Sequence, residues 1–156
     1  MTPSMKALWA SWNETRNFTL LFIDELTDAD LDKPLPRKKL NTVRLQAHEL
    51  ILFQRDVVAG LETKTLCYEE AYHYENWTKQ QLVERMTVLD EQLESVLEDM
   101  DGTEVIDYYG EKQNVHQILS MFIAHENMHI GQIIAFCYAV GIKIPEYITE
   151  NMALEG

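Results

Sequence analysis

Residues Met121–Gln132 read MFIAHENMHIGQ and place His125 and His129 one helical turn apart in an otherwise apolar run. Side chains four residues apart on a helix project from one face, with Cβ atoms roughly 5–6 Å apart, so both imidazoles can reach one ion. The stretch therefore predicts a helix that carries half of a metal site. A third ligand has to come from another part of the chain.

The composition of the 156 residues bounds the class of protein. A hydrophobic content of 46% excludes a disordered chain, and the length suits a single domain over residues 1–156. The formal net charge of −13 would repel a polyanion, so we expect no nucleic-acid partner. No segment offers about 18 uninterrupted apolar residues, and the N-terminus lacks the pattern of a signal peptide. We therefore expect a soluble, cytoplasmic protein with no membrane partner.

The two cysteines, Cys67 and Cys137, form no CxxC motif and have no histidine at zinc-finger spacing. This usage predicts two free thiols in a reducing compartment.

Apolar spacing, capping residues and helix-ending glycines and prolines predict four helices. They cover Pro3 to about Leu26, Thr42–Ala59 with Gly60 as the stop, Thr78 to about Met100, and Asn114–Val140 closed by Gly141. A long proline-bearing connector, Thr27–Asn41, joins the first two and has room for one short turn. The predicted fold class is all-α, a four-helix bundle, and ligand sites in such bundles are built from side chains on facing helices.

Two segments lack a clear helical period. Residues 61–77 mix aromatic and acidic side chains, and we expect an irregular, partly ordered excursion there. Thr103–Gln113 contains a run of β-branched and aromatic residues before Gly110, which favours a small hairpin or an extended loop packed on the bundle. The tail, Glu146–Gly156, is expected to add a short turn of helix.

His48 is the candidate third ligand, because it lies on the apolar side of the second predicted helix with Leu45 and Leu52. Burying the imidazoles of His125 and His129 without partners would cost about 1–3 kcal/mol each. A bound cation would offset that cost. The residues therefore predict a mononuclear metal site of His48, His125 and His129.

The remaining histidines have simpler explanations. His116 lies on the opposite side of its helix from His125, and His73 falls in the irregular segment. We expect both at the surface or in a loop.

The chain has His48 in its second predicted helix and, much later, the run HENMHIGQIIAFCYAVGIKIP. This pattern resembles that of the DinB-like family of metal-binding four-helix bundles, which includes YfiT-like and thiol-transferase branches. The similarity covers nearly the whole chain. The resemblance implies one divalent ion per chain, commonly zinc or nickel, held by His48, His125 and His129 with a position open to water or substrate. Members often carry an arginine after the second histidine of the pair, where this chain has Ile130.

Three nitrogen ligands with an open position are the catalytic arrangement of zinc, which lowers the pKa of a bound water or thiol. Family members of known activity are metal-dependent transferases or isomerases that use low-molecular-weight thiols such as bacillithiol or mycothiol. The resemblance therefore implies an enzyme of the thiol S-transferase type, with a small-molecule thiol and a small electrophilic substrate as partners.

Other functions use the same residues. HENMH matches the H-E-x-x-H pattern, which would make Glu126 the general base of a metallopeptidase. Glu126-x-x-His129 is also half of a di-iron signature, but the second predicted helix, which carries His48, offers no E-x-x-H. A metal that only staples the bundle is a third alternative. Besides Glu126, Arg55 is a candidate catalytic residue, because it lies two turns from His48 and would anchor a substrate carboxylate or pair with an acid.

The second and fourth predicted helices are apolar on two sides. The side away from the histidines carries Leu50, Phe53, Val57 and Leu61 on one helix and Leu119, Ile123, Ile130 and Ile134 on the other. A large exposed apolar patch is unusual on a monomer, so these helices predict a homodimer with two-fold symmetry. The alternative is that the first helix, the 61–77 segment and the tail cover these faces.

Overall fold

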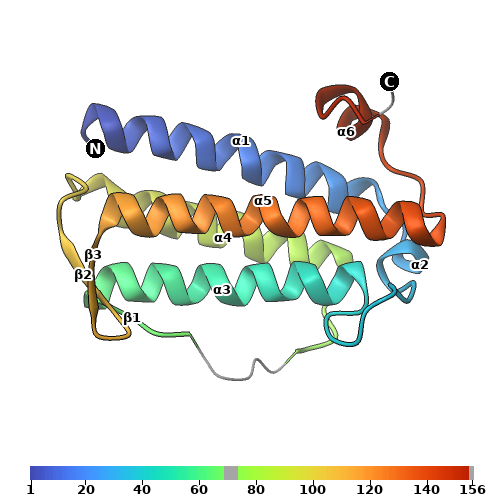
Figure 1. The fold of residues 1–156 in the computed structure, drawn as a ribbon, viewed down its shortest axis with the longest axis horizontal. Coiled ribbons are helices and arrows are strands. Elements are labelled where there is room, and N and C mark those ends of the chain that lie inside the picture. The colour runs from blue at the N-terminus through green and yellow to red at the C-terminus, as the bar shows by residue number, and fades with distance from the viewer. Residues whose placement is uncertain (69–73, 155–156) are drawn as a thin grey trace.

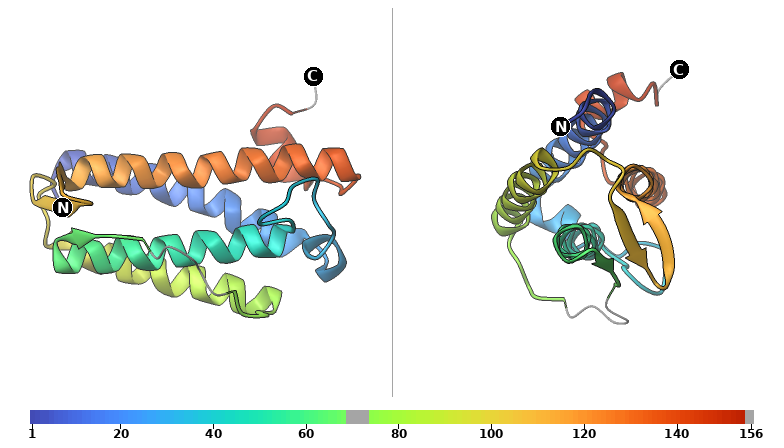
Figure 2. Two further views of the ribbon diagram at one scale, coloured as in Figure 1. Left: turned by 60° about the horizontal axis from the view of Figure 1, so that its bottom comes forward. Right: turned by 90° about the vertical axis from the view of Figure 1, so that its left-hand side faces the viewer.

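Four long helices form the body of the protein in the computed structural model, which describes residues 1–68 and 74–154. They are α1 (Pro3–Glu25), α3 (Val43–Thr63), α4 (Lys79–Glu98) and α5 (Val115–Val140). Each packs against two neighbours, and the end-on view shows them at the corners of a bundle in the order α1, α4, α3, α5 (Figure 1, Figure 2). The all-α prediction is confirmed.

Local capping explains where the long helices begin. The side chains of Thr2, Thr42, Thr78 and Asn114 each accept a hydrogen bond from a backbone amide in the first turn. Two short helices complete the chain, α2 (Asp28–Leu31) in the connector and α6 (Glu146–Asn151) in the tail. Both short turns had been predicted.

The helix that carries His48 is longer than predicted: α3 continues through Gly60 to Thr63. Its C-cap is Lys64, which has a φ of 61°. Gly60 serves close packing instead. A Cβ placed on it would lie 2.8 Å from the Cβ of Leu66, so only glycine lets the following strand approach the helix.

A small sheet closes one end of the bundle (Figure 1). Its strands are β1 (Thr65–Leu66), β2 (Val105–Tyr108) and β3 (Glu111–Asn114). β2 and β3 form an antiparallel hairpin, as the sequence predicted, and β1 runs parallel to β2 with Leu66 opposite Tyr108. The sheet therefore joins the end of α3 to the start of α5.

The apolar faces that suggested a homodimer are covered inside one chain. α5 packs against both α1 and α3, and α3 against both α4 and α5, so each has a partner on two sides. Buried within the chain are Leu50, Phe53, Val57, Leu61, Leu119, Ile130 and Ile134, and Ile123 is partly buried against them. The structure thus gives the predicted homodimer no support.

Within the described ranges, no helix is long and apolar enough to cross a membrane.

Candidate metal centre

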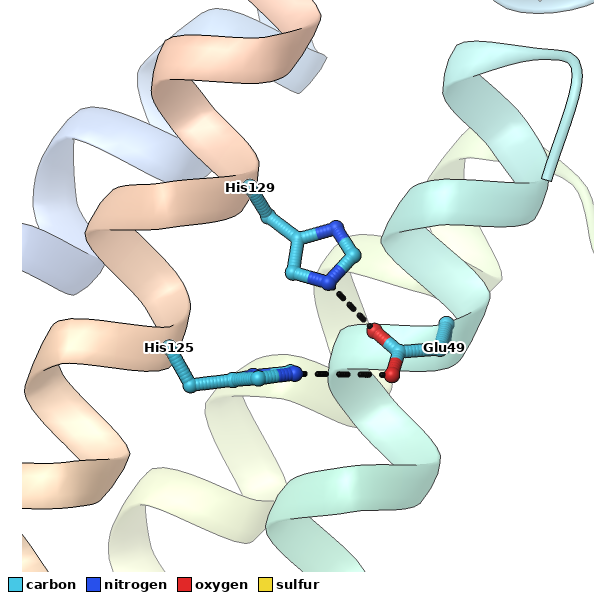
Figure 3. A group of neighbouring side chains, drawn as sticks. All are labelled: Glu49, His125 and His129. Atoms are coloured by element: carbon cyan, nitrogen blue, oxygen red, sulfur yellow. Dashed lines mark ion pairs between the residues drawn. The ribbon is translucent and has the colours of Figure 1, made fainter. Parts of the chain in front are cut away.

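His125 and His129 project from α5 toward α3, where the carboxylate of Glu49 faces both rings (Figure 3). The ligand atoms of the three residues all lie within 4.8 Å of one another. Nε2 of His129 is 3.0 Å from Oε2 of Glu49, and Nε2 of His125 is 3.5 Å from Oε1. The histidine pair therefore faces a common point, as predicted, and a carboxylate faces it from the opposite helix.

Gln46 determines which nitrogen of His129 is available to a metal. Its Oε1 lies 3.3 Å from Nδ1 of the histidine, and both side chains are buried. With the amide oxygen facing the ring, this contact favours the tautomer in which Nδ1 carries the ring hydrogen and donates it, because an amide oxygen only accepts. The lone pair of His129 is then on Nε2, directed at Glu49.

The contact between His129 and Glu49 consequently joins two acceptors. Oε2 of Glu49 has no hydrogen-bond partner among the residues that the structure places, although Nε2 is only 3.0 Å away. Two lone pairs at this distance repel each other unless a proton or a cation lies between them. Burial lowers the pKa of His129, against the opposing charge of Glu49, so the proton is disfavoured. The chemistry of these donors therefore fits a bound cation.

Within the described ranges, His125 is held by ring packing and makes no hydrogen bond. Its ring stacks on Phe53 with centroids 3.7 Å apart and 13° between the planes. The side chains of His125 and Glu49 retain 17% and 14% of their exposure, whereas His129 is buried. The centre is thus closed on the His129 side and reachable from solvent on the other.

The structure does not bring His48 into this group. Its ring stacks on Trp77 at 3.7 Å and meets the edge of Tyr74 at 5.2 Å. Successive residues of a helix point about 100° apart, so His48 and Glu49 leave α3 in different directions. Burial lowers the pKa of His48, which keeps the ring neutral beside Trp77.

Sequence reasoning missed Glu49, although a signal was present. Glu49 is an acidic residue in the most buried stretch of α3, and a carboxylate there needs a partner. It is the residue directly after the predicted ligand, about 100° around the helix, and it matched the apolar stripe less well than His48 did.

The two candidate catalytic residues lie elsewhere. Glu126 is fully buried, accepts a 2.6 Å hydrogen bond from Thr19 and lies 3.3 Å from Arg16, so it is not available as a base at the centre. Arg55 pairs with Asp56 at 2.7 Å, not with Glu126. It lines a cavity of about 760 Å³ on the His48 side of α3.

His116 lies in the first turn of α5 and its Nε2 is 2.9 Å from the Ser4 hydroxyl, away from the centre, in agreement with its predicted position. His73 lies outside the described residues.

Glu126 belongs to a polar cluster inside the bundle to which each of the four long helices contributes at least one residue. Arg16 donates to Gln54 at 2.8 Å and lies 3.5 Å from Asp90, which also accepts hydrogen bonds from Gln54 and Trp12. Burial raises the pKa of both Asp90 and Glu126, with the Arg16 charge opposing it. The glutamate of HENMH is therefore engaged inside the bundle and does not face the histidine pair.

Comparison with protein families finds a match to the DinB superfamily over residues 11–133. Among solved structures, a DinB-like protein from Bacillus cereus ATCC 10987 matches with a TM-score of 0.70 at 17% identity, covering 90% of this chain and 95% of that chain. A DinB-like protein from Bacillus subtilis matches with a TM-score of 0.68 at 14% identity, covering 90% and 97%. Comparison with curated proteins finds no match. At these identities the two structures show a shared fold.

Proposed function

Because this chain belongs to the DinB superfamily, we propose that it is a mononuclear metalloprotein in which Glu49, His125 and His129 hold one divalent ion. The observation that carries the proposal is the 3.0 Å approach of Nε2 of His129 to Oε2 of Glu49, two acceptors that need a cation between them. Two imidazoles and one carboxylate with an open position are the ligand set of many catalytic zinc sites. Zinc and nickel are the proposed ions.

The proposed activity is that of a thiol S-transferase with a small electrophilic substrate. A bound divalent ion would lower the pKa of an incoming thiol and so supply a nucleophile near neutral pH. Glu49 neutralises part of the charge of a divalent ion, which a third neutral histidine would not do. Gln46 orients His129, Phe53 orients His125, and the solvent-facing side of Glu49 and His125 leaves access for a substrate.

Two observations favour this proposal over the alternatives. The proposed ligands belong to neither apolar cluster of the bundle, and His125 and Glu49 retain some access to solvent, which favours a site that a substrate can reach over a metal with a purely structural role. A metallopeptidase would need Glu126 as its base, and that residue is engaged by Thr19 and Arg16 in the core.

Metal analysis and a thiol-consumption assay test the proposal. Protein purified without chelator is expected to contain about one divalent ion per chain. Metal-loaded protein should then accelerate the loss of a low-molecular-weight thiol in the presence of a reactive haloarene, and chelator-treated protein should not. Stoichiometric metal without acceleration for any thiol in a broad panel would favour the structural role, and cleavage of casein would favour the peptidase.

A further inference from the structure

A cavity of about 760 Å³ lies between α3 and α4, on the side of α3 that carries His48. The proposed metal centre lies between α3 and α5 instead, and the end-on view shows α4 and α5 on different sides of α3 (Figure 2). None of Glu49, His125 and His129 lines the cavity. Cavities of roughly 300–1,000 Å³ are typical sites for small organic molecules. The cavity is therefore a candidate site that is separate from the metal centre.

Part of the cavity wall is apolar. It is formed by Ile51 and Leu52 of α3, by Trp77, and by Val88 and Leu89 of α4. Ile51, Leu52 and Trp77 are buried, whereas Val88 is 50% exposed. An apolar group that covered this wall would leave water together with the Val88 side chain, which favours binding. The wall therefore suits a ligand with an apolar body.

Arg85 gives the wall a cation that has no ion-pair partner in the part of the chain that the structure describes. Its guanidinium lies over the Trp77 ring, 4.4 Å from the centroid. A stacked guanidinium keeps its N–H groups at the edge of its plane, where they can donate to both oxygens of a carboxylate. Stacking also restricts the side chain before a ligand arrives, which lowers the entropic cost of binding. Arg85 thus presents a preorganised group for binding a carboxylate.

The other charged side chains of the wall are already engaged. Arg55 pairs with the next residue along α3 at 2.7 Å. Glu75 accepts a 2.6 Å hydrogen bond from the indole N–H of Trp77. Glu84 accepts a 2.7 Å hydrogen bond from the side-chain amide of Gln80, which does not line the cavity. The guanidinium over the Trp77 ring is therefore the charge that the cavity offers to a ligand.

We propose that the cavity between α3 and α4 binds a small carboxylic acid with an apolar body. Arg85 pairs with the carboxylate, and the apolar body covers Trp77 and Val88. His48 contributes a neutral ring to the wall, because burial lowers its pKa. The site needs no metal ion, so it goes beyond the proposed function and can be tested without it.

Heteronuclear NMR of the tryptophan indole N–H groups tests the inference, because Trp77 is part of the cavity wall. The probes are phenylacetate and its neutral isostere phenylacetamide, and chelator-treated protein keeps the acid from binding at a metal. Trp77→Phe identifies the Trp77 resonance. Phenylacetate is expected to shift this resonance and to bind about tenfold more tightly than phenylacetamide. The resonance of Trp12, which is buried and does not line the cavity, should stay unchanged.

Two variants separate the carboxylate contact from apolar contact alone. Arg85→Gln should lower the affinity for phenylacetate to that for phenylacetamide, and the affinity for the amide should not change. Val88→Glu lies one turn after Arg85 on α4, so the introduced carboxylate competes for the guanidinium and should also weaken binding of the acid. Val88→Gln is its matched control without the charge and should bind the acid more tightly than Val88→Glu. Lys6→Gln, on the exposed side of α1, controls for net charge and should match wild type.

Several results would overturn the inference. Equal affinities of wild type for the acid and the amide would do so, as would an unchanged preference for the acid in Arg85→Gln. A Trp77 resonance that neither probe shifts would also overturn it. An equal loss of affinity in Lys6→Gln and Arg85→Gln would show that net charge, and not the Arg85 contact, attracts the acid. None of these results bears on the metal centre, because the titrations use metal-free protein.

Discussion

Glu49 and His129 approach each other across the α3–α5 interface, with 3.0 Å between Oε2 and Nε2, whereas His48, the next residue along α3, stacks on Trp77. The two neighbouring residues therefore contact different parts of the molecule, Glu49 the helix α5 and His48 the ring of Trp77. This relationship makes metal binding by Glu49 and by His48 separately testable.

Metal affinity should depend on Glu49, His125 and His129. Alanine at any of them removes a proposed ligand, so the loss should exceed the roughly 10–100-fold effect typical of residues that only orient ligands. Competition with a chromogenic chelator measures the affinity. His48→Ala is the matched control and should retain the metal, since its ring packs on Trp77. Retention of the metal in Glu49→Ala together with its loss in His48→Ala would restore the three-histidine site predicted from the sequence.

Gln46→Leu should weaken metal binding although Gln46 is not a proposed ligand. Without its Oε1, Nδ1 of His129 has lost the acceptor that keeps the lone pair on Nε2. The expected loss of affinity is about 10–100-fold. Gln80→Leu, on the exposed face of α4, is the control. Identical affinities in Gln46→Leu and wild type would mean that ring packing alone orients His129.

Arg16→Met should strongly destabilise the fold. It leaves the carboxylates of Glu126 and Asp90 without their cation inside the bundle, a change that typically costs about 3–5 kcal/mol in the free energy of unfolding. Urea denaturation measures it. Combining Arg16→Met with Glu126→Gln should recover part of the loss, and Lys6→Met on the exposed side of α1 should have little effect. A double variant no more stable than Arg16→Met would argue against the ion pair as the cause.

Stability should carry a pH dependence from Asp90. Burial raises its pKa in the folded protein above the ordinary value of 3.8, so in this window the native state holds more protons than the unfolded chain. The contribution of Asp90 to stability therefore falls as the pH rises from 3.8 toward the raised pKa. Asp90→Asn keeps an acceptor for Trp12 and Gln54 and should remove this part of the slope. Urea denaturation of chelator-treated wild type and Asp90→Asn across this range measures the free energy of unfolding at each pH. Parallel curves of this free energy against pH for the two proteins would refute the assignment.

The two thiols should differ sharply in reactivity. Cys67 is exposed, whereas Cys137 is buried and burial raises the pKa of its thiol to about 11. A native-state titration with Ellman's reagent should therefore modify Cys67 rapidly and Cys137 only on unfolding. Cys67→Ser should abolish the fast phase and Cys137→Ser should leave it intact. Two fast thiols in the native protein would contradict the burial of Cys137.

Much of the fold follows from local sequence. Apolar spacing and the caps at Thr42, Thr78 and Asn114 begin the helices where the chain itself supplies hydrogen-bond acceptors to the first turn. The spacing of His125 and His129 likewise fixes their common face, because the helix between them is rigid. These features depend on residues within a few positions of one another, and they were predictable for that reason.

The choice between His48 and Glu49 depends instead on how α3 is rotated about its own axis. Arg44 helps to determine this rotation, donating to Asp32 at 2.6 Å and to the Trp77 carbonyl at 2.8 Å, and so holding the connector and Trp77 against the same helix. Trp77 then covers His48, and Glu49 turns to α5. Glu126 shows the same effect, since it lies inside the histidine motif yet faces Arg16 in the core. Local sequence determined which residues could ligate a metal, and only contacts between distant segments decided which of them meet.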